Sequence, residues 1–147
     1  MTVDVSGFGL KVVLTASETF PSGITLTQFP DDVNAIDSPA IQLRDAATGL
    51  NGDMIVWSKG NPVPLTIAVI PNTEDDANLA VLAAANRAAA GRFPAKDEIN
   101  VTVTYPDGTV TRFIRGVVTD GILGRPVASS GRMTTKPYTF KFEDVAS

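Results

Sequence analysis

Apolar and polar side chains alternate along most of this chain, and this alternation restricts the fold more than any other feature. Residues 99–105 show it most clearly, because Ile99, Val101 and Val103 alternate with Asn100 and two threonines. Successive side chains of a β-strand point to opposite faces of a sheet, so a period of two is typical of strands with one buried face. The pattern recurs in residues 10–15, 24–27, 41–43, 63–69 and 138–143, and residues 54–57 are apolar on both faces. The sequence therefore predicts about eight strands, most of them rich in β-branched residues.

One segment follows a helical pattern instead. Residues 73–90 are rich in Ala and Leu, and acidic residues fill the first turn, where the helix dipole favours negative charge. Thr73 and Asp76 have the spacing of a capping box. Gly91 and Pro94 follow the segment, at positions where a helix of this length would end. We therefore expect one helix over residues 73–90.

Strands around a single helix define the expected fold class. It is mainly β with one helix (α+β), built as an antiparallel β-sandwich or β-barrel-like domain. We expect the helix to pack on the outside of the sheet through Leu79 and Leu82, which leaves the other sheet surface free. The length of 147 residues corresponds to one domain, residues 1–147.

Turn residues separate the strands after the helix. The sequence Pro106-Asp107-Gly108 favours a tight hairpin turn, since glycine adopts a positive φ at little cost. Residues 98–106 should therefore pair with residues 109–118. Gly116 should mark a bulge or the end of the second strand.

Three segments are expected to be loops. Residues 40–44 and 54–58 should form a second hairpin, with residues 45–53 as its tip. Residues 29–39 and 121–132 are long, polar and rich in turn residues, and loops of that length are usually functional. We expect 29–39 and 45–53 to be flexible in an isolated subunit and ordered only by adjacent subunits or rings, because neither has a run of large apolar residues.

The polar residues of these loops are the candidate interface residues. Asp31, Asp32, Asn34 and Asp37 form an oxygen-rich cluster that could hold Ca²⁺, but the EF-hand spacing and its closing Glu are missing, so we expect no metal site. Basic residues of the C-terminal third are spread out and could face acidic groups of a neighbouring subunit. We expect Trp57 to pack in the core or at an interface. The candidates for subunit and ring contacts are Asp31, Asp32, Asn34, Asp37, Gly49, Asn51, Gly52, Asp53, Arg125 and Arg132.

The composition removes most catalytic and redox chemistry. The chain contains no Cys and no His, which excludes disulfides, thiolate catalysis, Cys or His metal sites and the Ser-His-Asp triad. The acidic pair Asp75 and Asp76 is explained by its place at the helix start. Gly7-Phe8-Gly9 lacks the third glycine and the following helix of a dinucleotide fingerprint. We expect no catalytic residues, no enzyme activity and no cofactor.

Charge and hydropathy bear on partners and location. The 12 Lys+Arg against 16 Asp+Glu give a formal charge of -4, which argues against coating nucleic acid. The opening MTVDVSGFGL has no basic and no apolar region of the secretory type, so we expect no secretory signal. No apolar run approaches the roughly 20 residues of a membrane span. We therefore expect no membrane binding and synthesis in a cytoplasm.

The order of the expected elements is two strands, a polar excursion, a hairpin, a strand, a helix, a second hairpin and a closing aromatic strand. The stretches GFGLKVVLTASETFPSGITLTQFPDD, GLNGDMIVWSKGNPVPLTI, NTEDDANLAVL and GRMTTKPYTFKFED carry this order. Over essentially the whole chain they resemble the tail-tube proteins of contractile-tailed bacteriophages, whose fold is similar to that of the type VI secretion tube protein. None of these stretches is a catalytic signature.

The resemblance implies a structural role. Six subunits would form a ring whose strands join into one β-barrel, and rings would stack into a tube inside a contractile sheath. The implied partners are further copies of this chain, the tail sheath protein, and the baseplate and tape-measure proteins, while DNA would pass through the lumen without specific binding. The implied location is the tail of a virion assembled in the host bacterial cytoplasm.

Two alternatives stay open at this point. A tube-like initiator at the baseplate, or a terminator at the other end of the tail, would share the fold but not the unlimited stacking. A small β-sandwich module that binds a carbohydrate or another small ligand is the alternative outside tail structure, although few aromatic residues are available for stacking on a ligand.

Overall fold

The computed structural model describes residues 6–146, which form nine strands and one helix. The expected fold class is confirmed, because antiparallel strands dominate and a single helix accompanies them in this part of the chain. The elements are β1 (Lys11–Ala16), β2 (Phe20–Leu26), β3 (Ile36–Asp37), β4 (Arg44–Thr48), β5 (Met54–Ser58), β6 (Val63–Val69), α1 (Glu74–Ala85), β7 (Ile99–Thr104), β8 (Val110–Asp120) and β9 (Lys136–Ala146).

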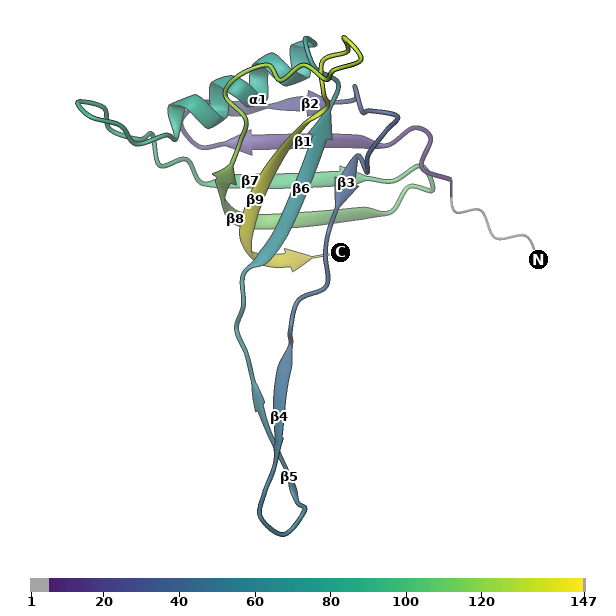
Figure 1. Ribbon diagram of the computed structural model, residues 1–147, viewed down its shortest axis with the longest axis vertical. Helices are drawn as coiled ribbons and strands as arrows, with labels where there is room; N and C mark the ends of the chain where they lie inside the picture. Colours follow the sequence, from purple (N-terminus) through teal and green to yellow (C-terminus); the bar gives the residue numbers. More distant parts are fainter. Residues whose placement is uncertain (1–5, 147) are drawn as a thin grey trace.

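Seven of the strands form one curved sheet in the order β2-β1-β7-β8-β9-β6-β3. In Figure 1, β1, β7 and β8 run across the view, whereas β6 and much of β9 run steeply. The long strands β8 and β9, with 11 residues each, connect the two directions. The sheet therefore curves over its own apolar face, and in the described residues it is an open sheet, not a closed barrel, with β2 and β3 at its edges.

The alternating apolar residues meet in one core, which confirms the faces predicted from the period of two. In β7, Ile99, Val101 and Val103 are fully buried. In β9, Tyr138 and Phe140 are fully buried in the same core. The core consists of Val12, Leu14, Ala16, Leu26, Leu65, Ile67, Val69, Leu79, Leu82, Ile99, Val101, Val103, Phe113, Tyr138, Phe140 and Phe142.

The helix α1 lies across one end of the sheet (Figure 1) and buries Leu79 and Leu82, as expected. Its N-terminus is also as expected, since Thr73 is the N-cap and its Oγ1 accepts the Asp76 N–H at 3.3 Å. The predicted C-terminus is wrong, because the helix ends at Ala85 and not at residue 90. Asn86 ends it, since its side-chain amide donates to the carbonyl of Leu82 at 2.9 Å.

The β7–β8 hairpin confirms the predicted pairing. Gly108 has φ +94° in the turn, and the Gly108 N–H donates to the Tyr105 carbonyl at 3.0 Å. Gly116 lies at a bulge, where the pairing register shifts between Ile99 and Val101. A Cβ at Gly116 would stand 2.2 Å from the ring of Phe142, so glycine lets this buried ring lie against the strand.

Buried carboxylates at both ends of α1 hold loops against the sheet, and no local sequence pattern predicted these contacts. Asp75 accepts the backbone N–H groups of Thr27 and Gln28 at 2.8 and 2.9 Å and so fixes the chain leaving β2. Asp97 accepts the N–H groups of Glu18 and Thr19 at 2.7 and 2.9 Å and so fixes the β1–β2 turn. The acidic pair at the helix start is therefore structural beyond its interaction with the helix dipole.

Asp76 forms a buried ion pair with Lys136, with 3.1 Å between Oδ1 and Nζ. It also accepts the hydroxyl of Tyr138 at 3.0 Å and the N–H of Asn72 at 3.1 Å. Burial raises the pKa of Asp76, but these hydrogen bonds and the Lys136 charge lower it more, so its pKa lies below the ordinary value. Burial and Asp76 together raise the pKa of Tyr138 well above its ordinary value. The network ties β9 to the helix N-terminus.

Within residues 6–146, no helix is long and apolar enough to cross a membrane. The expectation that there is no secretory signal rests on residues 1–10. Of these, residues 1–5 lie outside the described part of the chain.

Candidate assembly surface

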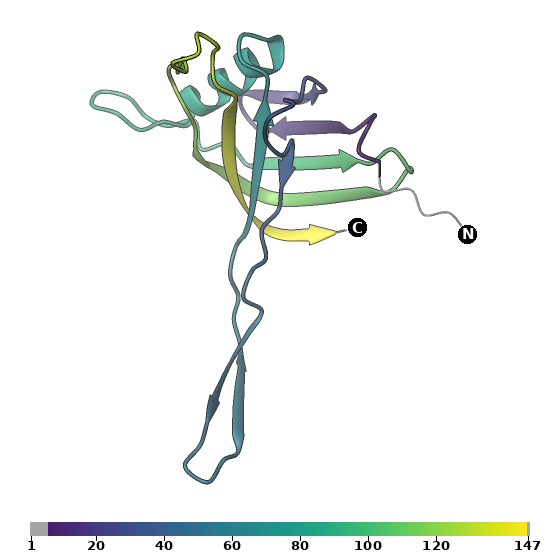
Figure 2. The same cartoon turned by 45° about the vertical axis from the view of Figure 1, so that its right-hand side comes forward.

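The segment between β3 and β6, here called the arm (residues 40–62), extends away from the sheet in both views (Figures 1 and 2). Its strands β4 and β5 pair only with each other, in a separate two-stranded sheet. Every residue of β5 is exposed, and Met54 and Ile55 are 71% and 56% exposed. Within the described residues, the run 54–57, predicted to be apolar on both faces of a strand, therefore stays partly to largely exposed.

The arm is held by contacts within itself. The Gly49 N–H donates to the Asp53 carbonyl at 2.7 Å, and Gly52 has φ +90° at the tip. Near the base, Asn61 donates to the Gln42 carbonyl at 2.9 Å. Large residues of β5 lie opposite small or polar residues of β4, since Trp57 pairs with Asp45, Val56 with Ala46 and Ile55 with Ala47. The hairpin cannot bury its own apolar side chains by cross-strand packing.

The predicted boundaries of this hairpin are wrong on one side. Residues 40–44 were expected to form the strand and 45–53 the loop, but β4 runs over Arg44–Thr48 and the tip is limited to residues 49–53. The tight tip lets the ladder continue to Thr48, which pairs with Met54. The alanines of β4 have no large side chains, so no alternating pattern marked the strand. Four candidate interface residues, Gly49, Asn51, Gly52 and Asp53, do lie at this tip.

The arm has the properties of a binding element. An isolated two-stranded hairpin is marginally stable in water. Contiguous exposed apolar surface on a protein marks an interaction site. Trp57 was expected in the core or at an interface. It lies in the arm and is 45% exposed, so it is not in the core, and its place at an interface stays a prediction.

Two segments of the body that are far apart in the sequence are joined by side-chain contacts. The Arg132 guanidinium contacts the Asp31 carboxylate at 2.9 Å, and the Thr135 hydroxyl donates to Asp32 at 2.6 Å. The hydrogen bond from Arg132 lowers the pKa of Asp31. Both ionic side chains are exposed, so the pair contributes little to stability. The first loop also contains the two-residue strand β3, which pairs with β6, so residues 29–39 are not a loop throughout as expected; their flexibility in an isolated subunit stays a prediction.

The oxygen-rich cluster of the first loop is dispersed among other partners. Asp31 and Asp32 are bound to Arg132 and Thr135, while Asn34 and Asp37 line a shallow surface hollow beside β6 and β9. Across residues 6–146, no group of three or more acidic side chains is arranged to hold a metal ion. Arg125 lines a separate hollow at the N-terminus of α1, and its role in subunit contacts is still a prediction.

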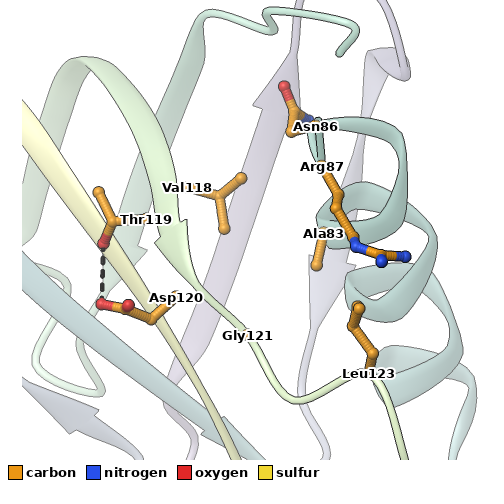
Figure 3. A pocket seen from close by; sticks show the side chains of 8 residues that line it. All are labelled: Ala83, Asn86, Arg87, Val118, Thr119, Asp120, Gly121 and Leu123. Atoms are coloured by element: carbon orange, nitrogen blue, oxygen red, sulfur yellow. Dashed lines mark hydrogen bonds between the residues drawn. The ribbon is translucent and has the colours of Figure 1, made fainter. Parts of the chain in front are cut away.

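A small pocket lies between α1 and the end of β8 (Figure 3). Its volume is about 210 Å³, and Ala83, Val118 and Leu123 supply apolar surface. Arg87 and Asp120 supply charge, and in the described part of the chain the Arg87 side chain makes no ion pair. No sequence signal predicted this pocket, because its residues lie near the ends of α1 and β8, which no local motif connects.

Comparison with known proteins gives a family and a fold. Residues 3–146 match the family described as "Tail fiber protein gp32". No curated protein sequence matches the chain.

Solved structures of contractile injection systems share the fold. One is a chain from an extracellular contractile injection system, the PVC sheath/tube terminator in the extended state (TM-score 0.57, 10% identity, covering 99% of this chain and 96% of that chain). A second comes from the PVC sheath-tube complex (TM-score 0.56, 12% identity, 98% and 92% covered). A third comes from the anti-feeding prophage baseplate, 6-fold symmetrised (TM-score 0.58, 8% identity, 99% and 96% covered). At these identities the likeness shows the fold alone.

Proposed function

The chain belongs to the family described as tail fiber protein gp32, and we propose that it is a structural subunit of the inner tube of a contractile, phage-like tail. In this role it has no catalytic activity and acts by assembling with copies of itself. The exposed apolar arm is the observation that carries the proposal. The side chains of Met54 and Ile55 are exposed in the single chain, and contact with another subunit would bury them.

The comparisons support a tube-like part. The family description names a tail fibre, whereas the matched solved structures come from sheath-tube, terminator and baseplate assemblies. These matches cover at least 92% of the other chains, so they extend over the whole curved sheet and not over one motif. We therefore favour a tube-like subunit over a fibre subunit.

Ring formation accounts for the two open edges of the sheet. The edge strands β2 and β3 leave backbone N–H and C=O groups that natural proteins cover or pair. Joining six copies edge to edge would close the open sheets into one barrel, and the matched anti-feeding prophage baseplate structure is 6-fold symmetrised. Such a barrel would surround a lumen, and the net charge of -4 would not hold DNA phosphates in it.

The further partners follow from this position in a tail. The tube would sit inside the sheath protein, begin at the baseplate and enclose the tape-measure protein and later the DNA. The chain would be located in the tail of a virion or virion-like particle, assembled in the host bacterial cytoplasm.

A terminator or initiator at a tube end is the second candidate. The matched structures favour it specifically, because two of them are described as a sheath/tube terminator and a tube terminating cap, and a third as a baseplate. Such a part would form one ring and stop, whereas a tube subunit would stack without limit.

Negative-stain electron microscopy of the purified protein, over a range of concentrations, tests the proposal. We expect rings and long tubes. A double variant in the arm, Ile55→Ser with Trp57→Ser, should form neither, because it removes the apolar contact surface. Val81→Ser is the matched control, since Val81 is 54% exposed on the helix and outside the arm.

Each outcome separates the candidates. Single rings without tubes would favour the terminator or initiator. Monomers at every concentration, or assembly unaffected by the arm variant, would contradict the proposed function.

A further inference from the structure

Phe8 lies on a fixed turn in front of β1. The Leu10 N–H donates to the Gly7 carbonyl at 3.3 Å, and the Phe8 N–H donates to Ser6 Oγ at 3.3 Å. The Phe8 ring is nevertheless 93% exposed. A phenylalanine carries about 150–250 Å² of burial, and such rings dominate the energetics of interfaces. The turn thus presents a single large apolar side chain to solvent.

The pocket between α1 and β8 has the size and lining to receive such a ring. Its volume is about 210 Å³, and its apolar surface comes from Ala83, Val118 and Leu123 (Figure 3). For comparison, an engineered apolar cavity of about 150 Å³ in another protein binds benzene. By volume, this open pocket can take a phenyl ring, which would lie against the apolar side chains beside the polar groups of Asn86 and Thr119.

The turn and the pocket lie at opposite ends of one hairpin. A Cβ built on Gly9 would lie 3.9 Å from Pro106, so the Phe8 turn is beside the β7–β8 turn, where β8 begins. The pocket is at the other end of β8. A strand of 11 residues spans roughly 36 Å at about 3.3 Å per residue. Phe8 cannot reach the pocket of its own chain.

We propose that Phe8 of one subunit enters the pocket lined by Val118 and Leu123 of the next subunit, and that this contact joins neighbours around the ring. The inference rests on the proposed function, since it needs assembly of identical copies. Two different patches of one chain meet in a head-to-tail contact, which closes into a ring when the rotation allows it. The arm is a separate surface, which would make its own contacts in the assembly.

Charges around the two patches are complementary. Lys11 begins β1 just after the Phe8 turn, and Asp107 is in the adjacent β7–β8 turn. The hydrogen bond from the Thr109 side chain lowers the pKa of Asp107, so it is ionised near neutral pH. The pocket presents Arg87 and Asp120. One docking geometry can therefore place each charge near an opposite one, which fixes the orientation of the subunits.

Cysteine cross-linking tests the contact directly, because the chain has no cysteine of its own. The variant Phe8→Cys with Leu123→Cys should give, on oxidation of the assembled protein, a ladder of covalent dimers and higher multimers on a non-reducing gel. Each single variant should give dimers at most. The matched control is Phe93→Cys with Leu123→Cys, since Phe93 is 94% exposed on a different loop, and it should give no ladder.

A second measurement is independent of disulfide geometry. Phe8→Ala should raise the protein concentration needed for half-maximal ring formation about tenfold or more, as expected for loss of a central aromatic contact. Phe93→Ala should leave that concentration unchanged.

The outcomes separate this contact from the proposed function. Rings that form without an 8–123 ladder, or with an equal ladder from the control, overturn the contact and leave the proposed function standing. Failure of the unaltered protein to assemble at any concentration overturns both. A ladder specific to the 8–123 pair, with weakened assembly of Phe8→Ala, supports the contact.

Discussion

The body and the arm of this protein are both built from antiparallel strands, but they treat their apolar side chains in opposite ways. In the body, Phe140 and its neighbours lie in one core with no exposed surface, and carboxylates such as Asp76 fasten the surrounding loops. In the arm, Met54 and Ile55 are mostly exposed, and within the described residues β4 and β5 pair only with each other. The same strand chemistry thus serves stability in the body, whereas in the arm we propose that it serves contact with a partner.

The difference teaches how to read apolar residues in strands. Burial of apolar area stabilises the fold by about 25 cal/mol per Å² only where the chain itself removes that area from water. In the arm this free energy is available when another subunit covers the hairpin. Substitutions in the two regions should therefore move different measurements: unfolding for the body, assembly for the arm.

The largest effect on stability is expected for Leu82→Ala in the body. Leu82 is fully buried between α1 and the sheet, so its truncation should lower the free energy of unfolding by about 2–5 kcal/mol. Chemical denaturation of the monomer measures this. Val81→Ala, on the exposed side of the same helix, is the control. A cost for Leu82→Ala below about 0.5 kcal/mol would mean that the helix does not pack as described.

A smaller loss is expected for Gly116→Ala. The added Cβ would overlap the ring of Phe142, which is buried and cannot turn away, so overpacking should cost about 1–3 kcal/mol. Gly124→Ala is the control, because a Cβ there has no neighbour within 4 Å. Equal stability of the two variants would refute the close approach of β8 and β9.

The body also contains an acid-sensitive component of stability. Burial raises the pKa of Asp97, but hydrogen bonds from Thr19, Asn86 and the Glu18 N–H lower it more, so the folded pKa lies below its ordinary value of 3.8. A carboxyl with a lowered pKa stabilises the fold above the unfolded pKa, and that contribution is lost as the pH falls through the folded pKa.

Denaturation between about pH 5 and pH 2 should therefore show stability falling with acid, and the fall should be shallower in Asp97→Asn than in the unaltered protein. A slope unaffected by Asp97→Asn would contradict the assigned role of this carboxylate.

The smallest effect on stability is expected in the arm. Trp57→Ala should change the free energy of unfolding of the monomer by less than about 0.5 kcal/mol, because Trp57 is 45% exposed and lies outside the buried core of the body. The same variant should weaken assembly. Thermal melting of the dilute protein and electron microscopy of the concentrated protein measure the two effects. A large loss of monomer stability would place Trp57 in the body and break the comparison.

The predictions from the sequence were correct where a residue's local pattern matches its burial in the folded chain. Alternation identified the buried faces of β6, β7 and β9, and Pro106-Asp107-Gly108 identified the hairpin turn, because both signals act over a few residues.

The errors have a common physical cause. The helix end depends on Asn86, whose amide also donates to Asp97, a residue beyond the helix. The body loops are joined by Arg132 and Asp31, which are far apart in sequence. No local pattern reveals such contacts. The exposure of the arm could not be predicted either. An apolar run such as 54–57 has the same composition whether it is buried by its own chain or by a partner.

Hydrogen exchange of the arm amides is the measurement that tests this account most directly. In the dilute monomer, the amides of β4 and β5 should exchange much faster than those of β7, because the isolated hairpin opens readily while β7 opens only with the body. In the assembled state the arm amides should become protected, with those of β7 unchanged. Arm amides as protected as those of β7 in the monomer, or still unprotected in assembled rings and tubes, would contradict the claim that the arm is completed by a partner.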